Sequence, residues 1–391
     1  MTSLSAEFRL GNFYFWYFAF IGVFGTYFAL YLQSRGFAAA EIALLLSLQQ
    51  VVRIVTPFFW GWLADRLRAR TAIIRVTLLL AVGAFALQFL VTGYGATIGV
   101  FVAMFSLWSA ALPLFEASVI AAVEGDSGRY GRIRLWGSVG FIVAVLLAGF
   151  ALDQLPMNAL PWMVLAMLMM AAGSSRALPD QRPVAARSAH DDSIWPILRR
   201  PPVAALFGAC FLMMAAQSAN FVFYSIYMVE NGHSKSTVGI LWSIGVIAEI
   251  AIFLSLPRLN KRFTPYVLFS FSFVVTALRY LLVGWLPGSL VLQLIAQSFH
   301  AFTFGTWHAA AMALLHQWFP AQFGTRGQAL YTSLSFGIGG AVGGVVAGLA
   351  WDAIGPAWMF TAMSGLAVIG WGISLRFVRP PDPPVAAMAE Y

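Results

Sequence analysis

Five ionisable side chains stand inside apolar stretches of this 391-residue sequence: two carboxylates, Glu116 and Glu249, and three guanidinium groups, Arg53, Arg134 and Arg279. A guanidinium can pair with a carboxylate or bind a solute anion through two parallel hydrogen bonds. A desolvated carboxylate can take up a proton near neutral pH, and a nearby arginine opposes that uptake. These residue types therefore predict anion binding and reversible protonation. Static ion pairs that hold helices together are the alternative for each.

Two histidines and an aromatic stretch extend this set. His300 and His308 are eight residues apart, about 80° around a helix, so both can face one cavity; packing roles are the alternative. The aromatic run 12–20 continues to Tyr27 and Tyr31, and these two tyrosines are candidates for a cavity wall. An aromatic pocket with an arginine suits an aromatic carboxylate.

The elements that position these residues are membrane-spanning helices. The sequence is 60% hydrophobic and only 10% charged, whereas soluble domains carry about 25% charged residues. The apolar runs are long and continuous and do not alternate, which favours helices over barrel strands. Dividing them at charged and Pro/Gly breaks gives roughly twelve spans of membrane-crossing length. The predicted spans are 11–33, 41–62, 71–92, 96–122, 133–153, 157–175, 203–229, 237–256, 266–286, 289–317, 327–350 and 356–377.

The basic residues predict the orientation. Among 23 lysines and arginines, only Arg35 and Lys235 fall in loops on one side, and Arg53, Arg134 and Arg279 fall within spans; all others lie on the opposite side. The positive-inside rule therefore predicts that both termini are cytoplasmic. The net charge of +8 then reflects topology, and no nucleic acid partner is expected.

The chain divides into two halves of six spans. We expect an N-terminal bundle at 1–175, a cytoplasmic linker at 176–201 and a C-terminal bundle at 202–391. The segments AGFALD (148–153) and AGLAWD (347–352) close corresponding spans, and their offset supports an internal duplication. The predicted fold is all-α, with two pseudo-symmetric six-helix bundles around a central cavity.

A loop motif carries the first resemblance to a known family. GWLADRLRAR (61–70) resembles the loop motif of the major facilitator superfamily in Gly61, Asp65, Arg66 and Arg70. The resemblance implies that these residues belong to a cytoplasmic gate. Arg68 departs from the pattern, because the family usually has glycine there.

The pair Glu116 and Arg134 resembles a second pattern. In the lactose permease and its relatives, a helix-four glutamate faces a helix-five arginine at this separation, and both bind substrate. The same resemblance places the aromatic stacking position on Phe141. It also matches Glu249, Arg279 and His300 to an acidic residue, an arginine and a histidine in helices eight, nine and ten, and implies a role in proton coupling. Gln297 and Thr303 stand where that family has a lysine and a proton-carrying glutamate.

Three further segments look most like the phenylpropionate permease group: YGRIRLWGSVGF, QSFHAFTFGTWHAAAM (297–312) and GQALYTSLSFGIGGAVGG (327–344). The resemblance implies proton-coupled symport of a small organic acid, a class that includes aromatic acids, by alternating access across a bacterial inner membrane. In this scheme Arg134, with Arg53 or Arg279, holds the carboxylate; Glu116, Phe141, Tyr27 and His308 complete the substrate site. A nucleoside or saccharide symporter and a drug or metabolite exporter are the alternatives.

Other functional classes have less support. H-E-x-x-H is absent, Cys210 is the single cysteine, and Val342 interrupts the only G-x-G-x-x-G-like stretch, so we expect neither an enzyme nor a metal or nucleotide site. We expect no cofactor, and the expected partners are the substrate, protons and the lipid bilayer. The chain is expected to act as a monomer.

Overall fold

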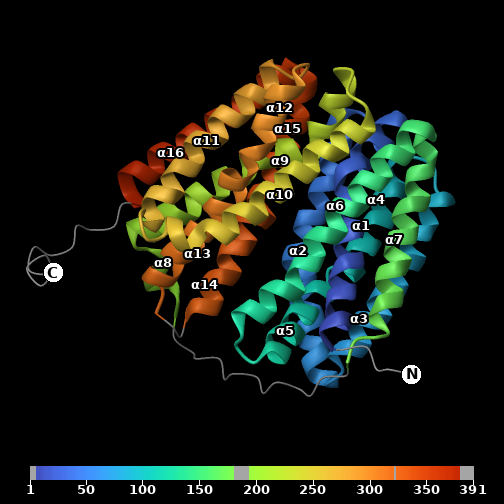
Figure 1. Cartoon of the computed structure of the whole chain (residues 1–391), viewed down its shortest axis with the longest axis horizontal. Coiled ribbons are helices and arrows are strands. Elements are labelled where there is room, and N and C mark those ends of the chain that lie inside the picture. The colour runs from blue at the N-terminus through green and yellow to red at the C-terminus, as the bar shows by residue number, and fades with distance from the viewer. Residues whose placement is uncertain (1–5, 180–192, 321–322, 379–391) are drawn as a thin grey trace, which may run out of the picture.

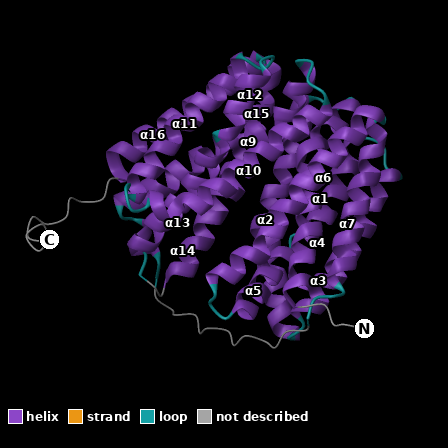
Figure 2. Cartoon of the chain, in the orientation of Figure 1, coloured by secondary structure: helices purple, strands orange, loops and turns teal. Residues whose placement is uncertain are grey.

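The computed structural model describes residues 6–179, 193–320 and 323–378, and these residues form helices and no strands (Figure 2). Eleven helices are long and apolar enough to cross a membrane. The tenth predicted span, 289–317, corresponds to α12, η3 and α13, which follow one another closely. The all-α fold with twelve spans is therefore confirmed.

The helices of the N-terminal half precede the residues left undescribed at 180–192. Their bounds are α1 Ala6–Ser34, α2 Ala39–Leu67, α3 Arg70–Ala86, η1 Leu87–Phe89, α4 Tyr94–Trp108, α5 Ala111–Val123, α6 Ser127–Gln154, η2 Met157–Ala159 and α7 Leu160–Ser175.

The C-terminal half begins with the short helix α8. Its elements are α8 Trp195–Leu198, α9 Pro201–Glu230, α10 Lys235–Leu259, α11 Pro265–Trp285, α12 Leu290–Ser298, η3 Ala301–Thr306, α13 Trp307–Trp318, α14 Gly324–Tyr331, η5 Thr332–Gly339, α15 Gly340–Ile354, α16 Pro356–Ile373 and η6 Ser374–Val378. The segments η3, η5 and η6 are π-helical, a geometry that often occurs at functional sites. Figure 1 shows the two halves as separate groups of helices, with α2 of the first beside the second.

Each half exposes its loops at two ends. We call the end with the loops 68–69, 124–126 and 260–264 the basic end, because these loops are flanked by arginine and lysine. The loops 35–38, 231–234 and 286–289 lie at the opposite end.

Helix α6 begins earlier than the sequence predicted. Its first residue is Ser127 rather than a residue near 133, because the Asp126 carboxylate accepts a hydrogen bond from the main-chain N–H of Arg129 at 2.9 Å. This bond also lowers the pKa of the Asp126 carboxyl. Arg134 therefore lies two turns inside a helix rather than at its start.

Close contact between α1 and α6 fixes the position of Arg134. A Cβ atom on Gly140 would lie 2.1 Å from the carbonyl oxygen of Phe15, and one on Gly137 would lie 2.9 Å from the Phe18 ring. Only glycine fits at the first of these distances without moving the backbone. The two glycines of GSVG thus allow α6 to lie close against α1. Arg134 lies beside the Phe18 ring of α1.

Candidate substrate and proton-coupling site

Two adjoining cavities of about 430 Å³ each lie between the halves. The central cavity takes its walls from α1, α2, α5, α6, α9, α10, η3, η5 and α15, and the mouth cavity takes its walls from α1, α2, α4, α5, α13, α14 and η5. Both include Gln50, Arg53, Leu112 and Phe336. The central cavity is largely aromatic, with Phe18, Phe24, Phe141, Phe221, Trp242, Phe304 and Phe336 in its wall.

Glu116 and Arg134 lie together, as their spacing predicted. Arg134 Nε is 3.7 Å from Glu116 Oε1, and Arg134 lines the central cavity. The guanidinium also lies 4.2 Å from the centre of the Phe18 ring, at cation–π distance. The Tyr130 hydroxyl donates to Glu116 Oε2 at 2.9 Å. Arg134 is thus partly neutralised and held against an aromatic ring.

Arg53 differs because it has no such partner. It is exposed on α2 and lines both cavities. Within the part of the chain that the structure describes, it has no hydrogen bond or ion pair. A positive charge without a counter-ion, in a mostly apolar cavity, favours an anionic solute there.

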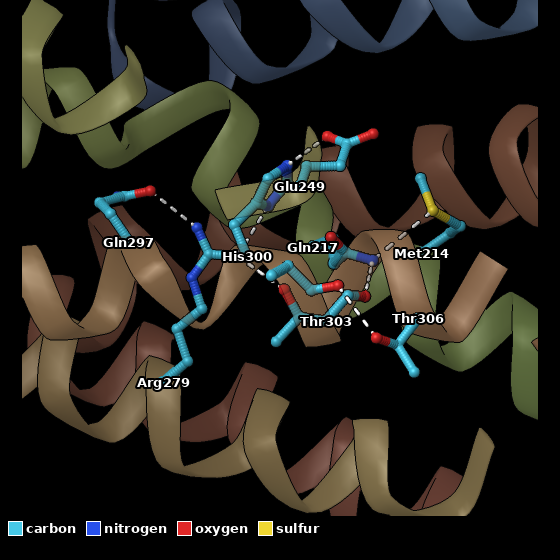
Figure 3. A network of polar contacts seen from close by, with 9 residues as sticks. Met214, Gln217, Glu249, Arg279, Gln297, His300, Thr303 and Thr306 are labelled. Atoms are coloured by element: carbon cyan, nitrogen blue, oxygen red, sulfur yellow. Dashed lines mark hydrogen bonds and ion pairs between the residues drawn. The ribbon is translucent and has the colours of Figure 1, made fainter. Parts of the chain in front are cut away.

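Arg279, His300 and Glu249 form a network within the C-terminal half (Figure 3). Arg279 is 1% exposed, and its guanidinium donates to Gln297 Oε1 at 3.0 Å and to Thr303 Oγ1 at 2.8 Å. It also lies 3.1 Å from His300 Nδ1, and His300 Nε2 lies 3.5 Å from Glu249 Oε2. The two side chains that depart from the lactose permease pattern, Gln297 and Thr303, are therefore the neutral partners of Arg279.

The hydrogen-bond roles in this network determine the tautomer of His300. A guanidinium only donates, so Nδ1 of His300 must accept from Arg279. The single ring proton of a neutral histidine then sits on Nε2 and faces Glu249. In a doubly protonated ring, the Nδ1–H group and the Arg279 guanidinium would both be donors and would face each other without an acceptor. Contact with Arg279 therefore favours the neutral form of His300.

The network lies behind the wall of the central cavity. Phe304, which lines this cavity, stacks on His300 with ring centres 5.5 Å apart, and it also stacks on His308 at 6.1 Å. His308 lines the mouth cavity, and its Nδ1 lies 2.9 Å from the Tyr331 hydroxyl. Phe304 thus separates the cavity from the buried charges.

Sequence reasoning missed one polar residue of this region. Gln217, in α9, donates to the main-chain oxygen of Thr303 at 3.1 Å (Figure 3). It is 1% exposed and joins α9 to the π-helical segment that follows His300. A buried glutamine in an apolar helix is itself a signal, because an unpaired amide in a membrane interior is costly.

The predicted cavity-wall residue Tyr27 lies elsewhere. It is fully buried, and its hydroxyl donates to the main-chain oxygens of Val145 at 3.0 Å and Lys235 at 3.1 Å. It is not among the residues that line the two cavities. The structure thus gives it a place in the contact between the halves, whereas Phe141 lines the central cavity as expected.

The predicted gate residues form a local structure at the basic end. Arg70 Nη2 lies 2.8 Å from Asp65 Oδ1, and Arg66 lies 5.3 Å from the centre of the Trp62 ring. Gly61 has open space around its Cα. Arg68 ends α2 with φ 51° and ψ 34°, a left-handed conformation that favours glycine, which explains the glycine usual there in the superfamily.

A helical fold with two bundles around cavities that contain charged residues defines a membrane-embedded secondary transporter of the major facilitator type, and not an enzyme. The chain belongs to the MFS_1 like family, whose model matches residues 8–362.

Two relatives and two solved structures are similar to this chain. The chain is 28% identical over 383 residues to a "Probable 3-phenylpropionic acid transporter" of Escherichia coli (strain K12), covering 94% of this chain and 95% of that one. It is 27% identical over 270 residues to the "Maltose permease" of Geobacillus stearothermophilus, covering 68% of each.

A mutant of the nucleoside transporter NupG superposes with a TM-score of 0.86 at 17% identity, covering 95% of this chain and 99% of the other. A bacterial homologue of the lysosomal transporter Spinster, inward-facing and unoccupied, gives 0.72 at 14% identity, covering 97% and 98%. These two likenesses show the fold.

Proposed function

We propose that this chain is a proton-coupled symporter for a small organic acid, with an aromatic acid as the preferred class. The observation that carries the proposal is Arg53, which lies in an aromatic cavity and has no counter-ion among the described residues. The carboxylate of the substrate would bind Arg53 and Arg134, while its apolar part contacts rings such as Phe18 and Phe141. The similarity to a 3-phenylpropionic acid transporter supports this class.

In this proposal Glu249 carries the coupled proton. Its carboxylate faces the Nε2–H of a neutral His300, and Arg279 keeps that histidine neutral. Protonation of Glu249 would change the charge balance beside a fixed guanidinium and so favour one arrangement of the helices. Arg279 itself does not contact the solute, because its neighbours Gln297, Thr303 and His300 occupy its guanidinium.

We further propose that residues 1–175 and 202–391 move as two bundles joined by 176–201, in a bacterial inner membrane with both termini cytoplasmic. The excess of arginine and lysine at the basic end supports this orientation. The mouth cavity lies toward that end, since Pro57, Pro113 and Ala329 line it. The described conformation would then be inward-facing. We propose that the monomer is the transporting unit.

Uptake into proteoliposomes tests the proposal. With an inside-alkaline gradient, we expect accumulation of labelled 3-phenylpropionate that a protonophore abolishes. In Arg53→Gln, loss of a charged partner should weaken binding by roughly 30-fold or more. The matched control Arg199→Gln, whose arginine stacks on exposed Trp195 away from both cavities, should behave as wild type.

A nucleoside or saccharide symporter is the second candidate. Gln49, Gln50 and Ser47 give the central cavity polar groups that could bind hydroxyls, and the maltose permease and NupG are similar proteins. Accumulation of labelled uridine or maltose, with no uptake of 3-phenylpropionate, would favour this candidate and contradict the first.

A further inference from the structure

Two aspartates connect the halves at the end opposite the basic loops. Asp153, at the end of α6, accepts hydrogen bonds from the main-chain N–H groups of Lys235 at 2.8 Å and Ser236 at 3.1 Å. Asp352, near the end of α15, accepts one from the N–H of Ala40 at 3.2 Å. Each aspartate therefore caps the first turn of a helix that belongs to the other half.

These bonds satisfy groups that a helix cannot satisfy itself. The first four N–H groups of a helix have no partner within it, and its N-terminus carries a partial positive charge that favours a carboxylate. In α10, Ser234 accepts from the N–H of Thr237, and Asp153 supplies acceptors for the two residues before it. The α10 cap is thus complete only while the two halves are in contact.

Each aspartate has a glycine one turn before it on the same helix face. A Cβ atom on Gly149 would lie 2.8 Å from the carbonyl oxygen of Lys235, and one on Gly348 would lie 2.4 Å from the Cβ of Ala43. The glycines let α6 approach α10 and let α15 approach α2. The repeated segments AGFALD and AGLAWD therefore place the same glycine and aspartate at both contacts.

Two further contacts lie beside the Asp153 site. The Tyr27 hydroxyl bridges Val145 of the first half and Lys235 of the second. The Gln33 amide donates to Glu230 at 2.7 Å. This end of the molecule is closed by polar contacts with defined partners, and Figure 1 shows α6 and α10 running beside each other there.

We propose that Asp153 and Asp352 are twin latches that hold this end shut and set the balance between the two access states. To open the cavity on this side, both carboxylates must leave their helix N-termini, and water must replace them. Because the two contacts join different helix pairs, α6 with α10 and α15 with α2, both must break before the halves separate at this end. This role requires alternating access and is independent of which solute is carried.

Distances between spin labels test the latches. Labels at Thr92→Cys and Gly288→Cys, two exposed loop positions at this end, would report the separation of the halves in a Cys210→Ala background. In wild type we expect mainly the short distance. In Asp153→Ala/Asp352→Ala, the open-to-closed ratio should rise by roughly 2- to 30-fold for each aspartate, the range measured for lost N-caps.

The matched control is Asp126→Ala. Asp126 caps α6 within its own half, so its loss should leave the distance distribution unchanged. If the double alanine variant cannot be purified folded, Asp153→Asn/Asp352→Asn, which keeps an acceptor but removes the charge, should show a smaller shift in the same direction. A folded double variant with the wild-type distribution would overturn the proposal. A shifted distribution without uptake of any organic acid would keep the latches and contradict the proposed substrate.

Discussion

Arg134 in α6 and Arg279 in α11 are both arginines within membrane-spanning helices, yet their surroundings differ. The Arg134 side chain is 34% exposed, lines the central cavity and lies beside a carboxylate. Arg279 is 1% exposed and contacts two neutral side chains and an imidazole. One guanidinium can therefore meet a solute, whereas the other cannot do so without a rearrangement.

This difference suggests a division of labour between the halves. The N-terminal half presents Arg53 and Arg134 to the cavity, which suits binding of an anion. The C-terminal half keeps a fixed charge on Arg279, which the His300 ring connects to Glu249, and this arrangement suits a response to protonation. Ionisable groups inside a membrane cost about 2.5–3.5 kcal/mol each on insertion scales, so two separate clusters imply two separate uses.

Among the variants that test these different roles of the two halves, Glu249→Gln is expected to have the largest effect. Glutamine imitates the protonated carboxyl and still accepts from His300, so binding and counterflow exchange should persist. Accumulation should be lost, because a carrier that binds no coupled proton cannot use the pH gradient to drive uptake. At a difference of about one pH unit, wild type with one coupled proton can accumulate its solute up to about tenfold.

Uptake under that gradient, compared with exchange in its absence, provides the measurement. Glu124→Gln is the control, since Glu124 is an exposed glutamate that follows α5 and lines neither cavity. Accumulation retained in Glu249→Gln would show that the proton is carried elsewhere.

The sequence predicted the architecture because its signals are local. Long apolar runs define helices in a membrane, and the basic residues define two kinds of loop, so the twelve spans were expected, whereas the π-helical interruption of the tenth span was not. The boundary of α6 was misplaced because hydropathy places the helix start after the charges, whereas the Asp126 cap starts it before them. Half of the predicted linker, residues 180–192, lies outside the described part of the chain.

The sequence indicated candidate residues for the site but not the contacts that they make. The spacing of Glu116 and Arg134 indicated a pair, but no local pattern shows that Arg53 lacks a partner. Tyr27 was expected near the substrate, but aromatic composition alone does not show which rings face the cavity and which face another helix. The repeated aspartates were visible in the sequence as evidence of duplication, yet their partners lie in the opposite half and depend on how the halves pack.

A smaller effect is expected at Arg134. In Arg134→Gln, affinity for the organic acid should fall by about tenfold, a loss of about 1.4 kcal/mol, because Arg53 still holds one end of the carboxylate. The double variant Arg134→Gln/Glu116→Gln distinguishes direct binding of the solute by Arg134 from neutralisation of Glu116. If Arg134 binds the solute directly, the double variant stays weak, as we expect. Recovery of wild-type affinity would mean that Arg134 only neutralises Glu116; equilibrium binding by calorimetry distinguishes the two outcomes.

The smallest effect is expected at His300, although histidine is the residue usually associated with proton transfer. Glutamine can accept from Arg279 and donate to Glu249, as the neutral imidazole does. His300→Gln should therefore still accumulate solute, with an initial rate lowered by only a few-fold because the amide is shorter and its geometry poorer. His300→Leu removes both bonds and leaves Glu249 without its donor, so it should lose coupling. Equal failure of both variants would assign the proton to His300 and contradict the neutral tautomer that its contact with Arg279 requires.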